Sequence, residues 1–142
     1  MAGLETADPV AVVGAWLEQH PRVLAAFGTD EHISGIVEAP WPHLRVTLGQ
    51  GGDPGDGKWL HSPEVLLEVY SDPRGQVGQA DGWRLAILAQ AAAVELELAD
   101  YTPGDPVVAA VAPTTSPQYT PLTNGQHRWV CGVKVTLHPP VG

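Results

Sequence analysis

The sequence predicts an α+β fold: a mostly antiparallel sheet of four to five strands with two main helices packed on one face and long hairpin loops. Three observations predict it. Stretches of alternating apolar and polar residues come in pairs around Gly- and Pro-rich segments, a long apolar stretch has helical periodicity, and an amphipathic helical stretch begins the chain. A chain of 142 residues without a repeat or a linker is the size of one domain, so we expect residues 1–142 to form a single domain.

The first predicted helix begins at Asp8 and Pro9, an acceptor side chain at the cap followed by a residue whose fixed φ suits the first helical turn. Its apolar residues recur on one face: Val10, Val13 and Leu17. The His20–Pro21 pair is expected to bend or break this helix, and Gly28 is expected to end a short second piece.

The segments 43–49 (HLRVTLG) and 62–71 (SPEVLLEVYS) alternate between apolar and polar residues, which predicts two half-buried strands joined by a long hairpin loop. The predicted inward residues are Leu44, Val46 and Leu48 in the first strand and Val65, Leu67 and Val69 in the second. Residues 33–39 (ISGIVEA) are a weaker strand candidate.

A long helix is predicted from Asp81 over the segment DGWRLAILAQAAAVELELAD. Its predicted apolar face is Trp83, Ile87, Val94 and Leu98, with Leu85, Leu88, Ala92 and Leu96 beside it. Few polar residues interrupt this surface, so we expect the sheet and a further surface to cover the helix together.

Two more strands are expected at 106–112 and 126–139, around a Pro- and Thr-rich loop at 113–125. One face of the last strand is apolar: Trp129, Cys131, Val133, Val135 and Leu137.

The net charge of −9, from 16 acidic and 7 basic residues, has the wrong sign for a protein that grips phosphates, so nucleic-acid binding is not expected. Charged residues are only 16% of the chain; either other subunits bury part of the surface, or the 16 Gly and 14 Pro dilute the charge in loops. The lone cysteine and the lack of a basic leader or long apolar run predict a soluble protein made in a reducing cytosol, with no membrane contact.

The segment GGDPGDGKW partly matches a phosphate-binding loop, since Gly52 is followed by four residues and then by Gly57 and Lys58. Trp59 replaces the hydroxyl residue that ligates magnesium, and Asp53 and Asp56 repel phosphate. The spacing also lacks the ligand pattern and terminal Glu of a calcium loop. We therefore interpret the segment as a flexible hairpin loop.

We predict no catalytic residue, cofactor or metal site. The six histidines show no ligand pair at helical spacing, and Cys131 lies on the predicted core face, where a buried inert thiol is expected. Glu95 and Glu97 are two residues apart on a helix, so they do not face each other.

Taken in order, these elements resemble a tail terminator (tail-completion) protein of long-tailed bacteriophages, of the kind found in phages of actinobacteria. The resemblance spans nearly the whole chain and rests on five segments and on the passage VYSDPRG: VLAAFG, HLRVTLG, PEVLLEVYSD, GWRLAILAQAAAVELEL and HRWVCGVKVTLHP. No invariant motif accompanies it.

The resemblance implies a non-enzymatic virion protein, assembled in the host cytoplasm, that forms a ring of six copies. The ring would cap the major tail tube protein, end its polymerisation and meet the head–tail connector protein. DNA would pass through without specific binding, and we take the acidic composition to suit such a channel.

Two segments are candidate assembly-interface loops because their Gly, Pro and polar content does not support order in isolation. The first is Gly51, Gly52, Asp53, Pro54, Gly55, Asp56, Gly57, Lys58 and Trp59, and the second is Thr114, Thr115, Ser116, Pro117, Gln118 and Tyr119. Two alternatives stay open: a head-completion or connector protein of the neck, and a small ligand-binding or enzymatic module.

Overall fold

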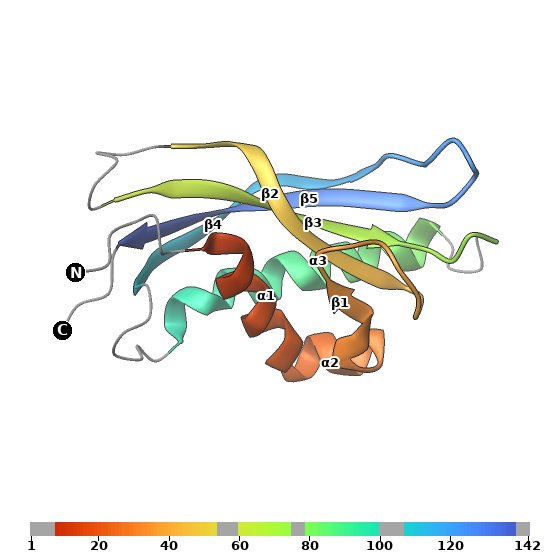
Figure 1. The fold of residues 1–142 in the computed structure, drawn as a ribbon, viewed down its shortest axis with the longest axis horizontal. Helices are drawn as coiled ribbons and strands as arrows, with labels where there is room; N and C mark the ends of the chain where they lie inside the picture. The colour runs from red at the N-terminus through yellow and green to blue at the C-terminus, as the bar shows by residue number, and fades with distance from the viewer. Residues whose placement is uncertain (1–7, 54–59, 75–78, 100–106, 139–142) are drawn as a thin grey trace.

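The computed structural model describes residues 8–53, 60–74, 79–99 and 107–138, and it has the predicted α+β architecture. Three α-helices lie on one side of a five-stranded sheet (Figure 1). The elements in chain order are α1 (Pro9–Gln19), α2 (Pro21–Phe27), η2 (Asp30–His32), β1 (Ile33–Ser34), β2 (His43–Asp53), β3 (Ser62–Tyr70), α3 (Gln79–Val94), η3 (Glu95–Leu98), β4 (Val107–Tyr119) and β5 (Arg128–His138).

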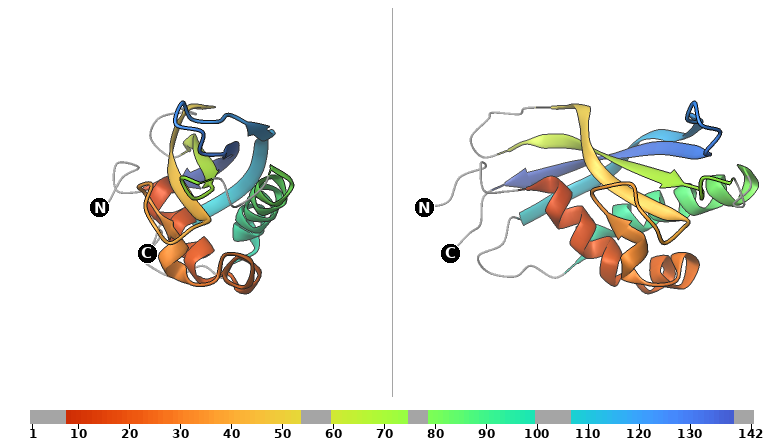
Figure 2. Two further views of the ribbon diagram at one scale, coloured as in Figure 1. Left: turned by 90° about the vertical axis from the view of Figure 1, so that its right-hand side faces the viewer. Right: turned by 45° about the vertical axis from the view of Figure 1, so that its right-hand side comes forward.

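The strand order across the sheet is β1-β2-β3-β5-β4, and every pair is antiparallel except the short parallel pair β1 and β2. Two hairpins, β2–β3 and β4–β5, supply four of the strands. They close at opposite ends of the long axis of the molecule (Figures 1 and 2). The hairpins that the alternating pattern predicts are therefore confirmed.

The two N-terminal helices begin and end as the sequence predicts. Asp8 Oδ1 accepts hydrogen bonds from the backbone N–H groups of Val10 (3.0 Å) and Ala11 (3.2 Å), which satisfies free donors of the first turn of α1. His20 separates α1 from α2, and Gly28 ends α2 with φ +117°, a conformation that favours glycine.

The prediction of a strand over residues 33–39 is mostly wrong, because only Ile33 and Ser34 pair with β2. The Ser34 hydroxyl accepts a hydrogen bond from the Ile36 N–H (3.3 Å) and donates one to the Ile36 carbonyl (3.1 Å). These local bonds close a turn directly after Ser34, so the chain leaves the sheet edge there.

The core lies between the sheet and the helices. Its fully buried strand residues include most of those predicted from alternation: Leu44, Val65, Leu67, Cys131, Val133, Val135 and Leu137. Leu48 was predicted to be buried and is 58% exposed. The register of β2 shifts between Leu48 and Gly52, and the strand bends away from the helices at this end (Figure 1).

The long helix forms where predicted, as α3 followed by η3. Most of its predicted apolar face is exposed, whereas Leu85, Ala92 and Leu96, predicted to lie beside that face, are buried. Trp83, Ile87 and Leu98 are exposed by 47%, 36% and 81%. The side that meets the sheet is rich in alanine: Leu85, Ala86, Ala89, Ala92, Ala93 and Leu96. Small side chains bring the helix close to the strands, which lets the buried Gln90 amide donate to the carbonyls of Gly132 (2.9 Å) and Thr115 (2.7 Å).

The predicted loop at 113–125 is largely wrong, since β4 continues to Tyr119 and includes Thr114, Thr115, Ser116, Pro117, Gln118 and Tyr119. Of these, Thr115, Gln118 and Tyr119 pair with β5. Two prolines fit because β4 is the last strand in the order, and its register shifts between Pro113 and Thr115 and again before Gln118. Gly51, Gly52 and Asp53 likewise belong to β2, whereas Pro54, Gly55, Asp56, Gly57, Lys58 and Trp59 lie outside the described residues.

Candidate assembly surfaces

The first candidate surface is an apolar stripe on the solvent side of α3. Trp83, Ile87 and Ala91 are exposed at four-residue spacing, and Leu98 of η3 extends the stripe. An open groove of about 420 Å³ adjoins it between α2 and α3, lined by Ala25, Ala26, Arg84, Leu85 and Leu88. Large apolar side chains that recur on one exposed helix face are typical of a contact surface rather than of scattered surface residues.

The second candidate surface lies where α1 meets the β1 edge of the sheet. A groove of about 250 Å³ runs between α1 and the strands, and its helix wall consists of Val10, Ala11, Gly14, Ala15 and Glu18. The strand wall includes Ile33, Ser34, Gly35 and Val46. Ile36, Val37 and Leu48 are exposed nearby by 60%, 38% and 58%.

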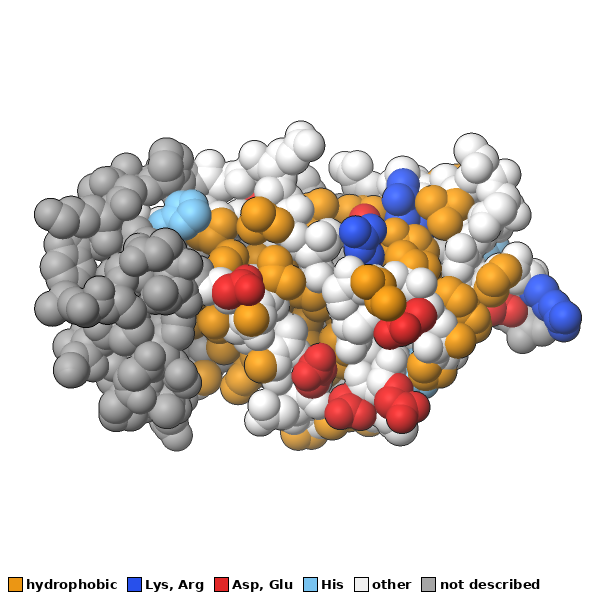
Figure 3. Space-filling model, viewed as in Figure 1, with side chains coloured by type: hydrophobic (Ala, Val, Ile, Leu, Met, Phe, Trp, Pro, Cys, Tyr) orange, Lys and Arg blue, Asp and Glu red, His pale blue; other side chains and the backbone are white. Residues whose placement is uncertain are grey.

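This second surface is acidic. Five exposed carboxylates come from α1 and from the segments around α2 and β1: Asp8, Glu18, Asp30, Glu31 and Glu38. Figure 3 shows acidic side chains spread over this face among apolar ones. No described cation forms an ion pair with any of the five, so the surface keeps its negative charge.

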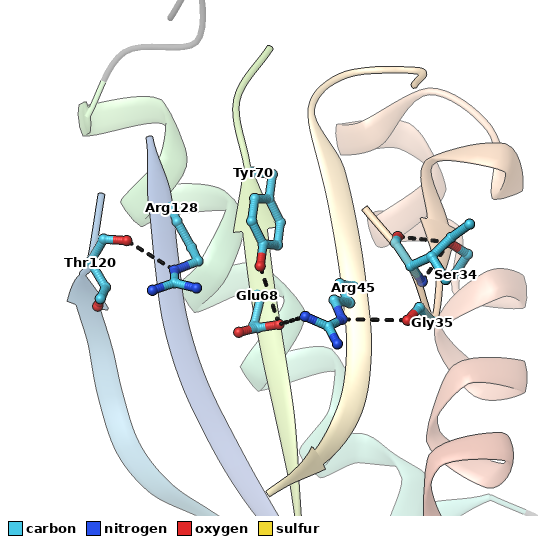
Figure 4. A network of polar contacts seen from close by, with 8 residues as sticks. Ser34, Gly35, Arg45, Glu68, Tyr70, Thr120 and Arg128 are labelled. Atoms are coloured by element: carbon cyan, nitrogen blue, oxygen red, sulfur yellow. Dashed lines mark hydrogen bonds and ion pairs between the residues drawn. The ribbon is translucent and has the colours of Figure 1, made fainter. Parts of the chain in front are cut away.

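The face of the sheet that points away from the helices carries a polar network (Figure 4). Arg45 Nη1 lies 3.3 Å from Glu68 Oε1, and the Tyr70 hydroxyl donates to the same oxygen at 3.5 Å. Arg45 Nε also donates to the Gly35 carbonyl at 3.4 Å. Because Glu68 is 7% exposed, this pairing compensates a nearly buried charge and ties β1, β2 and β3 together.

His43, the first residue of β2, belongs to the same face of the sheet. Its side chain has 0% exposure, and its Nε2 is 2.9 Å from the Ser34 hydroxyl. Burial lowers the pKa of His43, since the charged imidazolium would lose its hydration. The buried His43 side chain therefore links the start of β2 to Ser34 of β1.

The structure describes three residues of the first candidate loop: Gly51, Gly52 and Asp53. Gly52 has φ +114°, and the Gly51 N–H donates to Glu64 Oε1 at 3.3 Å. A phosphate-binding loop needs such N–H groups free for the ligand, whereas here a carboxylate already accepts one of them. The described part of this segment therefore has the wrong electrostatics for phosphate.

In the second candidate segment, Thr114–Tyr119, some residues are buried and others are exposed. Pro117 is buried and the Thr115 carbonyl accepts from Gln90, whereas Thr114, Ser116 and Gln118 are exposed. Tyr119 is held at the end of the strand, its hydroxyl 2.6 Å from His127 Nδ1. The structure does not bring this segment near the described part of the first, Gly51–Asp53, because β3 and β5 lie between β2 and β4 in the sheet.

Cys131 has no exposed surface, and burial raises the pKa of its thiol to about 12, so it is the buried thiol that the sequence predicts. Within residues 8–53, 60–74, 79–99 and 107–138, no three His, Cys, Asp or Glu side chains are grouped so that they could hold a metal ion. None of the helices in these ranges is both long and apolar enough to span a bilayer.

Sequence reasoning missed the two open edges of the sheet. β1 covers β2 only at Leu44 and Arg45, and in the described structure no strand lies beyond β4. The signal that could have found them is the lack of charge: residues 46–52 and 107–119 contain no ionisable side chain except Tyr119.

No model of a protein family matches the chain, and no curated protein matches it. Among solved structures, the chain is similar to one from the structure described as "Virion of native gene transfer agent (GTA) particle". The match has a TM-score of 0.55 and 17% sequence identity, and it covers 92% of this chain and 94% of the other. At this identity the match shows a shared fold.

Proposed function

We propose that this chain is a structural, non-enzymatic virion protein of a phage-like particle. In this proposal residues 1–142 act as one domain, and six copies form a ring that caps the tail tube, ends its polymerisation and joins it to the head connector. The observation that carries the proposal is the fold match to a chain of a virion particle, which covers both chains almost end to end.

The surfaces support assembly as the mode of action. A closed ring needs two different patches on each copy, because each subunit meets its two neighbours through different faces. The apolar stripe on α3 and the second candidate surface, where α1 meets β1, are two such patches. They lie on different parts of the molecule, since α3 packs against β4, β5 and β3 whereas α1 packs against β1, β2 and β3. The described cavities are open grooves lined mainly by apolar side chains, and they lack a cluster of catalytic groups.

The projecting hairpins are the proposed contacts to the tube and the connector. They close at opposite ends of the molecule, so one end can face the tube while the other faces the head (Figure 2). In this proposal the segments Gly51–Trp59 and Thr114–Tyr119 contact neighbouring proteins. The acidic composition leaves DNA free to slide through the ring.

A tube-capping experiment tests the function. Purified tube protein is polymerised with and without this chain, and tube lengths and the position of a gold-labelled chain are recorded by electron microscopy. We expect shorter tubes with the label at one end only. Tubes of unchanged length without end label would refute the capping role.

Deletion of residues 53–57 tests the first hairpin. Because Asp53 is the last residue of β2 and is not part of the core cluster, the variant should keep the far-UV circular dichroism and melting temperature of the parent chain. We expect it to lose end labelling of tubes. Normal capping by the folded variant would remove this hairpin from the proposal.

A head-completion or connector role in the neck is the second candidate. The fold neighbour's description specifies the virion but no component of it, so the fold match favours both roles equally. Two pull-downs of this chain, one with tube protein and one with portal-side proteins, distinguish the two roles. A tail terminator binds tube ends, whereas a connector subunit binds the portal side.

A further inference from the structure

We propose that adjacent copies of this chain join by continuing the sheet, with the open edge of β2 in one copy pairing antiparallel with the open edge of β4 in the next. This inference rests on the proposed ring. It identifies the surfaces through which the copies would meet.

The two edges lack charges and prolines, two of the features that usually prevent strand addition, although the register shifts once within each stretch. From Val46 to Gly52 the β2 edge has no charged residue and no proline, and the same holds for Val107 to Ala112 of β4. Natural proteins place charges, prolines or covering elements on long open edges, because an unpaired edge recruits another strand. The second half of β4, with Pro113 and Pro117, has that protection.

Part of the β2 stretch lies opposite part of the β4 stretch when position is measured along the strands. Leu48 of β2 is level with Pro113 of β4, through the successive partners Val65 and Val133. Asp53 is level with Ala110, because Asp53 pairs with Ser62, Ser62 Oγ lies 2.8 Å from Thr136 Oγ1, and Thr136 pairs with Ala110. A sideways step without a shift along the strands therefore brings Gln50–Gly52 beside Val111 and Ala112, whereas Leu48 comes beside Pro113.

The strand directions also agree. β2 is antiparallel to β3, β3 to β5, and β5 to β4, so β2 and β4 run in opposite directions within one copy. A neighbour in the same orientation thus offers β4 as an antiparallel partner for β2. Two-residue β1 is short enough to leave this part of β2 uncovered.

The same sideways step also brings two helices of neighbouring copies together. α3 packs under β4 and β5, and α1 packs under β1 and β2, so the α3 of one copy comes alongside the α1 of the next. The exposed Trp83 and Ile87 side chains would then meet the groove whose helix wall includes Ala11, Gly14 and Ala15. Gly14 has open space above it, with no atom within 4 Å of where a Cβ would lie.

Charge favours this head-to-tail arrangement over a symmetric one. Pairing of β2 with β2 would face the five unpaired carboxylates near that edge with the same five of the partner. β4 carries no charged side chain from Val107 to Tyr119. A second copy that presents β4 therefore avoids like-charge repulsion.

Cysteine cross-linking tests the arrangement. Gln50 and Ala112 are exposed on the two edges at nearly the same level, and native Cys131 is buried and does not compete. We mix size-tagged Gln50→Cys and Ala112→Cys chains at concentrations where native mass spectrometry detects oligomers of the parent chain, and then oxidise them. We expect disulfide-linked heterodimers in the mixture, no dimers from either variant alone, and a ladder ending in a closed species from the double variant.

Self-linked dimers of one variant at the same yield would overturn the inference in favour of a symmetric contact. Oligomers without cross-links would also overturn it, although the proposed ring would stand. A chain that stays monomeric at every concentration would overturn it too, and tube capping would then decide the proposed function separately.

A charge on the β4 edge provides an independent test. Ala110→Lys should abolish the oligomers, because a lysine on an open edge blocks strand addition. Thr123→Lys, exposed at the turn between β4 and β5 and away from both edges, is the matched control and should keep them. Both variants should melt like the parent, and oligomers that persist in folded Ala110→Lys would contradict the inference.

Discussion

His20 and Glu95 connect the break between α1 and α2 to the C-terminal end of α3. His20 Nε2 donates to Glu95 Oε2 at 2.7 Å, and Arg22 Nη1 lies 3.5 Å from the other carboxylate oxygen. The Trp16 indole N–H donates to the Ala92 carbonyl at 2.8 Å beside this pair. The His20–Pro21 interruption thus places polar groups of two helices over the end of a third.

The Glu95 contact predicts an acid-sensitive part of the stability. The hydrogen bond from His20, and then the positive charges of His20 and Arg22, lower the pKa of Glu95 from 4.5. A carboxyl whose pKa is lower in the folded state stabilises the fold above the unfolded pKa and loses that effect as pH falls through the folded value. Glu95→Gln should therefore melt below the parent at neutral pH, and the difference should shrink below about pH 4.5.

Melting curves of both chains between about pH 3 and pH 7 measure this difference. Glu97→Gln is the control, because Glu97 is exposed and forms no described ion pair. A gap between Glu95→Gln and the parent that stays constant with pH would contradict the assignment.

Local signals in the sequence were enough to predict the starts of α1 and α2 and the hairpins. Asp8 accepts the predicted cap hydrogen bonds, and the alternation of Val65, Leu67 and Val69 matches their burial. These features depend on neighbouring residues, so a single sequence contains the information that they need.

The wrong predictions concern features that depend on contacts between residues far apart in the sequence. Apolar residues occur on every side of α3, so periodicity alone did not tell that alanines such as Ala89 face the sheet while Trp83 faces solvent. Pro113 and Pro117 indicated a loop, yet an edge strand with bulges accommodates them. The open edges of β2 and β4 exist only because of the strand order, which no local pattern contains.

Two glycines should respond to alanine in opposite directions. A Cβ at Gly82 would lie 2.5 Å from Trp129 Cδ1, and this partly buried indole packs against the core, so Gly82→Ala should destabilise the fold by about 1–3 kcal/mol. Gly14 lies inside α1 with open space around it, so Gly14→Ala should stabilise by about 0.5–1 kcal/mol. Urea unfolding followed by tryptophan fluorescence measures both, and destabilisation of equal size would contradict the packing at Gly82.

The Arg45–Glu68 pair should show strong coupling. Arg45→Met leaves the Glu68 carboxylate, 7% exposed, with the Tyr70 hydroxyl at 3.5 Å as its one partner among the described residues, which should cost about 1–3 kcal/mol. Glu68→Gln in the same background removes the unpaired charge, so the double variant should be less destabilised than the sum of the single changes. A double-mutant cycle from urea unfolding measures the coupling, and simple additivity would show that the pair contributes nothing.

Cys131 should be unreactive in the folded protein. Its thiol has no exposed surface, a pKa of about 12, and weak hydrogen bonds to the carbonyls of Leu67 and Ala86, both at 3.7 Å. Because a thiol reagent attacks the exposed thiolate, labelling at about pH 8 should require unfolding and should rise with urea along the unfolding curve. The engineered Gln50→Cys chain is the control, since its surface thiol should react at once in native buffer. Rapid labelling of the native parent chain would instead show an accessible thiolate at Cys131, and the enzymatic alternative would regain a nucleophile.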